Sequence, residues 1–565
     1  MRNTQTNKSA TSDAMQRADE LLRQMTIEEK VMQLSSVFPL GLFNTEGTNH
    51  SQLDALLKDG IGHVSALGLI GHKTPEVLAK AVNAIQRYLV TETRLKIPAI
   101  FHNEAMSGVV APHFTAFPTS IALAATWDPT AVEEMSDIIR RQMRSVGMLQ
   151  ALAPVMDVAR DARWGRVSET YGEDPYLVSA MSVAFTRGLQ GEDLTEGVLA
   201  TAKHFIGYAE YIKSNYAAVS LAEAVRQLLP KAEVTVVAGT GVVPKEPTDI
   251  PAAVAAARNA DLVILAIGGR SAWSHECTEG EGSDTANKDL PPQQVELINA
   301  VTALGKPTVA VISMEGPYAL TSVIDKLPAV LTDYYGGPYQ GTAIAEAIFG
   351  VTNPGGKLPI TLPRHVGQMP IHYAQKWGSG YRRTRDDIHH GYLDMLSTPL
   401  FPFGHGLSYT TFKYSELELH SDTVGVNDEL QLSLSVTNTG SMRGTEVVQL
   451  YVSDTATGVT LPAQQLVGFV RVDLDPGESK DVAFRIPMSL LGYTGLSGDF
   501  VIEPGPVEVS AGSSSDDIRC SAKFTITGGI RVTKSEEREF LSETSIGTEK
   551  ADGKEEERLH HHENA

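Results

Sequence analysis

The spacing of apolar residues divides the first 400 residues into two similar regions. Up to about residue 210, stretches with helical spacing such as SDAMQRADELLRQM alternate with the short apolar runs HVSALGLI, PAIFH, LQALAPVMD and ATAKHF. From 211 to 400, the apolar runs VTVVAG, DLVILAIGG, PTVAVIS and AVLTDYY alternate with helical patterns such as PPQQVELINAVTAL. Alternation of short buried strands with helices predicts an α/β region built on a mainly parallel sheet in each case.

A different pattern begins near residue 401. The segments ELQLSLSVTNTG, GTEVVQLYVSD, QQLVGFVRVDL and KDVAFRIP alternate apolar and polar residues with a period of two, between Gly, Asn, Asp and Pro. This pattern predicts an all-β sandwich over residues 401–528. Residues 529–565 end in EKADGKEEERLHHHENA, which is charged and nearly devoid of large apolar side chains, so we expect a disordered tail there.

Composition narrows the class of protein. The chain has 565 residues, 42% hydrophobic and 20% charged, which fits several globular domains. A net charge of −21 argues against a nucleic acid partner, whose phosphates require basic patches. We find no apolar run of about 18 residues that could span a membrane and no apolar leader segment, so a cytoplasmic location is expected. The only cysteines, Cys277 and Cys520, lack metal-ligand spacing.

A glycine-rich acidic segment follows the apolar run DLVILAIGG. Residues 276–294 read ECTEGEGSDTANKDLPPQQ and place Glu276, Glu279 and Glu281 among glycines. A carboxyl group on such a loop can act as a general acid when an apolar cover raises its pKa. The alternative is a solvated acidic loop on the surface.

Two other segments carry charged residues in apolar surroundings. LAPVMDVARDARWGRVSETYGEDPYL begins at Leu152 and contains Arg166, and ATAKHFIGYAE begins at Ala200 and contains Lys203 and His204. Charged side chains are rarely buried without a partner, so this group indicates a polar ligand.

With five further segments, the chain resembles glycoside hydrolase family 3, the exo-acting β-glucosidases and β-xylosidases. These segments are RADELLRQMTIEEKVMQL, IPAIFHNEAMSG, FPTSIALAATWDP, NPGGKLPITLP and FPFGHGLSYTTFKY. The resemblance implies a TIM-like (β/α) barrel over 1–210, an α/β sandwich over 211–400 and a fibronectin type III-like domain over 401–528. It also implies a small-molecule glycoside or oligosaccharide as substrate and no cofactor or metal. It leaves open whether the protein forms a homo-oligomer.

The resemblance also assigns roles to individual residues. It implies that Glu104 of HNEAMSG, Arg166, Lys203 and His204 hold the hydroxyl groups of the terminal sugar. It points to Glu281 of the GEG element as general acid/base, in preference to Glu279 and Glu276. One departure is Ser107, where many relatives carry His.

A second departure concerns the nucleophile. The family is retaining, which implies an Asp at the end of a later barrel strand, in a Ser-Asp-Trp or Ser-Asp-Tyr element. Between His204 and Glu281 the only aspartates are Asp249, in a proline-rich turn, and Asp261, at the start of an apolar run, and neither fits. Asp333 lies in AVLTDYYGG, whose neighbours match the second region.

The barrel itself is therefore expected to be incomplete. We count about five strand candidates before residue 211, whereas a closed barrel of this type has eight. Two functions remain open from the sequence. One is an exo-acting β-glycosidase that is impaired by loss of its nucleophile. The other is a non-catalytic sugar-binding pseudoenzyme or an internally deleted gene product.

Overall fold

The computed structural model describes residues 4–39, 42–44, 47–65, 74–204, 219–271, 276–376, 391–454 and 456–548. Contacts divide the chain into two compact units. The first unit is formed by Met1–Phe117, Ala131–Pro154 and Ala184–Lys203. The second unit is formed by Pro118–Thr130, Val155–Val183 and His204–Ala565. Two segments of the expected barrel region therefore pack with the later part of the chain.

The first unit contains an open parallel sheet of five strands in the order β1-β4-β5-β6-β7. Its strands are β1 Ser36–Val37, β4 His63–Ser65, β5 Ile100–Asn103, β6 Gln150–Ala151 and β7 Leu199–Ala200. A short hairpin pairs β2 Phe43–Asn44 with β3 Gly47–Thr48. Within the described residues the sheet does not close, which agrees with the expected incomplete barrel.

The helices of this region begin where the sequence provides caps. Thr26 and Glu29 form a capping box at the start of α2, and Pro75 occupies the first turn of α4 after Thr74. Helix α4 buries Leu78, Val82, Ile85 and Leu89, an apolar stripe of helical period. The helices are α1 Thr4–Gln24, α2 Ile27–Gln33, α3 His50–Leu57, α4 Pro75–Thr91, α6 Pro129–Ser145 and α7 Pro175–Gln190. Among the described residues we find no helix that is both long and apolar enough to span a membrane.

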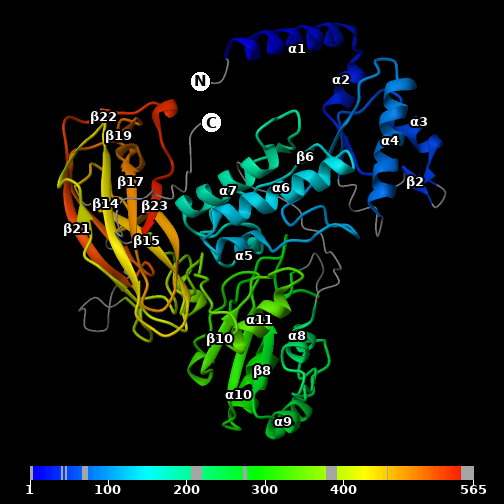
Figure 1. Ribbon diagram of the computed structural model, residues 1–565. Helices are drawn as coiled ribbons and strands as arrows, with labels where there is room; N and C mark the ends of the chain where they lie inside the picture. The colour runs from blue at the N-terminus through cyan, green and yellow to red at the C-terminus, as the bar shows by residue number, and fades with distance from the viewer. Residues whose placement is uncertain are drawn as a thin grey trace. The chain divides into compact units, whose positions relative to one another are not determined.

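The second unit has an α/β part with a three-stranded parallel sheet in the order β10-β9-β8 (Figure 1). Its strands are β8 Val263–Gly268, β9 Thr308–Ser313 and β10 Ala329–Thr332, and its helices are α8 Leu221–Leu228, α9 Ile250–Asn259, α10 Pro292–Thr302 and α11 Gln340–Ile348. A further short helix of this unit, α5, covers Ser120–Ala124. The expected strand VTVVAG, residues 234–239, forms no strand, and Val236 and Val237 in it are exposed.

The β-sandwich also belongs to the second unit. One sheet joins β11 Phe412–Tyr414, β14 Glu429–Asn438, β17 Ser479–Pro487 and β23 Glu543–Thr548, with β12 Glu418–Leu419 on β14. The other joins β13 Thr423–Gly425, β21 Ile518–Thr527, β20 Gly505–Gly512, β15 Gly444–Asp454 and β16 Gln465–Leu474. A small third sheet contains β18 Tyr493–Thr494, β19 Phe500–Ile502 and β22 Arg531–Val532. Alternate residues of both large sheets fill one apolar core.

The expectation of a disordered tail from residue 529 is wrong for its first part. Strand β22 lies in the small sheet, and β23 pairs with β17 from Lys480↔Thr548 to Arg485↔Glu543. Ile546 packs against the sandwich core, so one apolar side chain in a polar stretch is enough to place this strand at the edge of the sheet. The remainder, 549–565, lies outside the described residues.

Candidate active site

The GEG loop, residues 280–282, docks directly on residues 164–166, the WGR turn, and both lie in the second unit. The backbone N–H of Gly165 donates to Asp284 Oδ1 at 2.9 Å, and the N–H of Thr285 donates to the carbonyl of Arg163 at 3.0 Å. A β-carbon on Gly165 would lie 2.0 Å from the carbonyl oxygen of Gly280. The turn therefore needs glycine because the loop backbone occupies the place of a side chain.

Arg166 lies at the centre of this contact and is buried. Its guanidinium binds Glu169 through two nitrogens: Nε donates to Oε1 at 2.7 Å, and Nη2 contacts Oε2. Its third nitrogen, Nη1, lies 3.4 Å from Glu281 Oε1. Arginine suits this position because its planar fork can bind two carboxylates at once.

Glu281 is brought to this arginine by the docked loop. Its side chain is 7% exposed, and Glu279, two residues earlier, is 1% exposed and paired with the buried Lys288. These two carboxylates are therefore not part of a solvated surface loop. Glu276, in contrast, is exposed.

A further buried carboxyl group lies behind the turn. Ser168 Oγ donates a short hydrogen bond to Glu315, which follows β9. Burial raises the pKa of Glu315 to about 8, and the nearby Glu279 and Glu169 act in the same direction. Glu315 is therefore largely protonated at neutral pH, which reduces the repulsion among the acidic groups around Arg166.

The first unit holds two of the residues that the sequence assigned to sugar binding. Glu104 directly follows β5, and Lys203 comes three residues after β7. Lys203 Nζ lies 2.5 Å from Glu104 Oε2, and both side chains are only partly exposed. The carboxyl ends of parallel strands meet at one edge of a sheet, which explains why these residues meet.

His204 is oriented by an aspartate of its own unit. Its backbone N–H donates to Asp157 Oδ2 at 3.1 Å, and its Nδ1 lies 2.7 Å from the same oxygen. The carboxylate selects the tautomer with a proton on Nδ1 and directs Nε2 outward from the pair.

The sequence did not indicate four of these partners. Glu169, Glu315, Lys288 and Asp157 each hold a residue of the site or of its loop. Only the spacing of Arg166 and Glu169, three residues apart in one turn, could have been noticed in advance. Ser168 and Glu315 are 147 residues apart, and only the folded chain brings them together.

The aspartates considered as nucleophile have other surroundings. Asp249 caps α9 by accepting from the N–H of Ala252 at 3.0 Å, and Asp261 is exposed ahead of β8. Asp333 directly follows β10 of the α/β sheet, accepts from Ser313 Oγ at 2.9 Å and also contacts Gln340. The Asp333 segment is thus part of the α/β sheet, as its sequence neighbours indicated.

Two segments of the chain match known domain families. Residues 26–230 match the glycosyl hydrolase family 3 N terminal domain, and residues 446–515 match the fibronectin type III-like domain. The chain thus contains a glycosyl hydrolase family 3 N terminal domain and a fibronectin type III-like domain. The family matches cover the WGR turn and the Lys203–His204 pair in one domain and strands β15 to β20 in the other.

Relatives match the chain to different extents. A putative β-xylosidase from Formosa agariphila is 26% identical over 91% of this chain and 95% of its own length. That alignment spans 730 positions, more than the 565 residues of this chain, so the relative has segments without a counterpart here. A periplasmic β-glucosidase from Salmonella typhimurium is 37% identical over 48% of this chain, but only 35% of its own length is covered.

Solved structures of β-glucosidases share the fold. One from Erythrobacter marinus has a TM-score of 0.81 at 23% identity, covering 90% of this chain and 98% of that one. One from Listeria innocua, in complex with glucose, has a TM-score of 0.75 at 21% identity, covering 91% and 99%. The chain thus shares its fold with these β-glucosidases.

Proposed function

We propose that this protein acts on the terminal non-reducing β-D-glucosyl or β-D-xylosyl residue of a glycoside, with Glu281 as general acid/base. The observation that carries the proposal is the position of Glu281, which is buried in a docked loop and held 3.4 Å from Arg166. The names of the relatives, β-xylosidase and β-glucosidase, support the choice of sugar.

Each unit carries charged groups of the kind that bind sugar hydroxyls. Glu104 and Lys203 in the first unit, and Arg166 and His204 in the second, offer carboxylate, ammonium, guanidinium and imidazole groups. Such groups form charge-assisted hydrogen bonds with hydroxyls, which are stronger than neutral ones. A neutral sugar needs no metal or cofactor for this contact.

Hydrolysis itself is proposed to be strongly reduced. Retaining hydrolysis needs two carboxyl groups about 5 to 5.5 Å apart, one to attack the anomeric carbon and one to protonate the leaving oxygen. The sequence offers no aspartate of the expected kind, and the longer alignment with the Formosa relative supports loss of a barrel segment. Loss of a nucleophile costs on the order of 10⁴ to 10⁶ in rate in other hydrolases.

The second proposed function is sugar binding without catalysis, by a pseudoenzyme or an internally deleted product. It is favoured by the same missing aspartate. Two measurements on the full chain distinguish the proposals: release of nitrophenol from β-glucosides and β-xylosides, and ligand-observed NMR of glucose and xylose. Slow nitrophenol release by the unmodified chain supports the enzyme. Monosaccharide binding at roughly millimolar affinity without release supports the pseudoenzyme, because few contacts offset the cost of association. If the full chain shows neither nitrophenol release nor sugar binding, both proposals are refuted.

A further inference from the structure

The hydroxyl of Tyr373 connects the β-sandwich to the segment that carries Arg166. The backbone N–H of Leu466, in β16, donates to the hydroxyl of Tyr373 at 2.9 Å. The Tyr373 hydroxyl in turn donates to Asp174 Oδ2 at 2.6 Å, and Asp174 Oδ1 accepts from the N–H of Leu177 at the start of α7. All four residues belong to the second unit. One phenol therefore joins a sandwich strand to the Val155–Val183 segment at Asp174.

Aromatic packing makes this connection rigid. The ring of Tyr373 stacks on Phe403 with a centroid distance of 4.6 Å and meets Tyr451 edge-on. Nearby, Trp127 packs edge-on against Phe469 of the sandwich at 5.1 Å. These side chains are buried, so the sandwich meets its neighbours through a packed core rather than through a wet interface.

Residues 359–373, which lead to Tyr373, also contact the Val155–Val183 segment that carries Arg166. Glu173 is fully buried and accepts from the N–H and hydroxyl of Thr361 at 2.8 Å and from the N–H of Tyr373 at 3.0 Å. The N–H of Glu173 donates to the carbonyl of Pro359 at 3.1 Å. Residues 359–373 thus form a strap across the segment just after Arg166.

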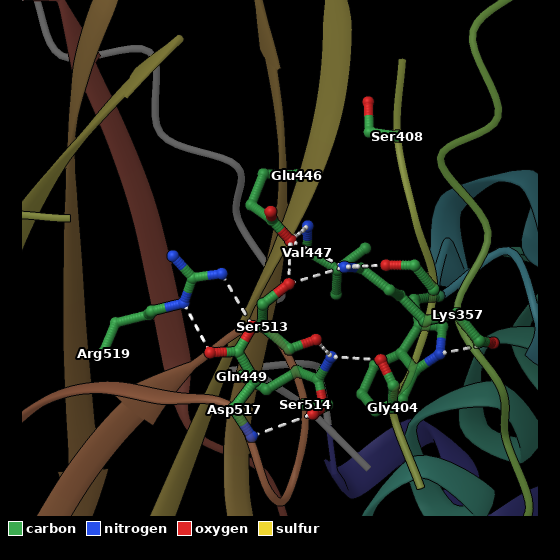
Figure 2. A network of polar contacts seen from close by, with 12 residues as sticks. Lys357, Gly404, Ser408, Glu446, Val447, Gln449, Ser513, Ser514, Asp517 and Arg519 are labelled. Atoms are coloured by element: carbon green, nitrogen blue, oxygen red, sulfur yellow. Dashed lines mark hydrogen bonds and ion pairs between the residues drawn. The ribbon is translucent and has the colours of Figure 1, made fainter. Parts of the chain in front are cut away.

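The sandwich fixes the other end of this strap through a buried ion pair. Figure 2 shows Lys357 reaching Glu446 at 3.0 Å and Ser513 Oγ at 2.7 Å, while Ser513 Oγ donates to Glu446 at 3.1 Å. Gln449 Nε2 donates to the carbonyls of Gly404 and Ser513 in the same network. Every group in this network has a partner, which such burial requires. The sandwich therefore holds the chain at Tyr373, where the strap ends, and at Lys357, two residues before it begins.

We propose that the β-sandwich is a positioning element for the candidate sugar site, and that Tyr373 is the positioning residue through which it holds the Arg166 turn. The sandwich does not need to touch the sugar for this role. Because Arg166 orients Glu281, loosening the strap would loosen both groups of the site. The consequence for sugar affinity rests on the proposed function, whereas the consequence for the turn does not.

The test uses Tyr373→Phe in the full chain, which keeps the ring but removes the hydroxyl shared by Leu466 and Asp174. We expect hydrogen exchange of peptides covering 159–172 to become about tenfold faster, because two buried groups lose their partner. Peptides of β14 and β15 should keep their protection. Glucose or xylose affinity should fall by a similar factor. Tyr409→Phe is the matched control, since its exposed hydroxyl donates to the carbonyl of Ala347 outside the strap.

Ser542→Ala provides a second and milder variant. Ser542 Oγ lies 2.7 Å from the hydroxyl of Tyr176, and its N–H continues to donate to that hydroxyl after the substitution. A smaller increase of exchange in the same peptides supports the proposal. Unchanged exchange at 159–172 in Tyr373→Phe, or a uniform increase that includes β14 and β15, overturns it. If the unmodified chain binds no sugar, the proposed function fails, and the exchange result alone decides the positioning role.

Discussion

Gly165 and Gly280 touch so closely that a β-carbon on Gly165 would lie 2.0 Å from the Gly280 carbonyl oxygen. This contact joins the WGR turn to the GEG loop, two motifs that are 115 residues apart at Arg166 and Glu281. The two motifs thus meet through their backbones. The ion pair between Arg166 and Glu281 depends on this backbone contact.

Gly165→Ala should therefore displace the loop. The added methyl meets backbone atoms that cannot rotate away, so we expect a loss of about 1–3 kcal/mol in the free energy of unfolding. Urea unfolding measures the loss, and hydrogen exchange of residues 276–289 should become faster. Gly529→Ala is the control, because nothing lies within 4 Å of its added β-carbon. Equal stability of both variants would contradict the described docking.

Replacing Glu281 by Gln should reduce the hydrolysis rate to an extent that depends on the leaving group of the substrate. The amide keeps the shape of the side chain but has no acidic proton to donate, and nitrophenyl glycosides hardly need one. Any residual activity on alkyl glycosides should thus fall far more than activity on nitrophenyl glycosides. Initial rates on both substrate types measure this. Glu276→Gln, in the exposed part of the loop, is the matched control, and equal losses on the two substrate types would argue against an acid role.

Stability should decrease as pH rises from about 6.5 to 8, because the buried His102 and His372, whose pKa burial lowers to about 4, act in the opposite sense only below 6.5. Burial raises the pKa of Asp174 to about 6, of Glu173 to about 7 and of Glu315 to about 8. A folded-state pKa above the unfolded value means that the stabilisation is complete below the unfolded value and is lost as pH rises through the folded value. Carboxyls with a lowered pKa, such as Glu246 beside Arg270, act only at lower pH.

Urea unfolding at several pH values measures this dependence. Glu315→Gln removes the group with the highest of the three pKa values, so its stability should vary less between pH 7 and 8 than that of the unmodified chain. A free energy of unfolding that rises with pH across this range would show that these carboxyls are ionised in the folded protein.

The sequence predicted those parts of the fold whose pattern is local. DLVILAIGG forms β8, and the period-two segments form the strands of the sandwich, because burial on one or both faces determines their pattern. VTVVAG is also rich in apolar residues but forms no strand, and Val236 and Val237 in it are exposed, since strand formation also requires a neighbouring strand. Conversely, ETSIGT looks too polar for a strand, yet β17 offers it an edge.

The site was predictable only as a set of residue types. Motif resemblance indicated Arg166 and Glu281 but not that they contact each other, because no local pattern records the docking of two distant loops. The partners Glu169 and Glu315 have no motif of their own. They are needed because an arginine and several carboxyls are buried together, and this becomes apparent only in the folded chain.

A 2-fluoroglycoside should leave the mass of this protein unchanged. Such reagents trap the covalent glycosyl-enzyme of retaining glycosidases, which forms only when a carboxylate attacks the anomeric carbon. Asp249 is used as a helix cap, Asp261 precedes β8, and Asp333 is bound by Ser313 and Gln340 in the α/β sheet, so none has the expected strand-end setting of a barrel. Positioning by Arg166 and proton donation by Glu281 cannot replace the attacking group. Intact-protein mass spectrometry measures the outcome, with a retaining β-glucosidase treated alongside as positive control. A stoichiometric adduct on this chain would overturn the proposed impairment, and peptide mapping of that adduct would identify the nucleophile.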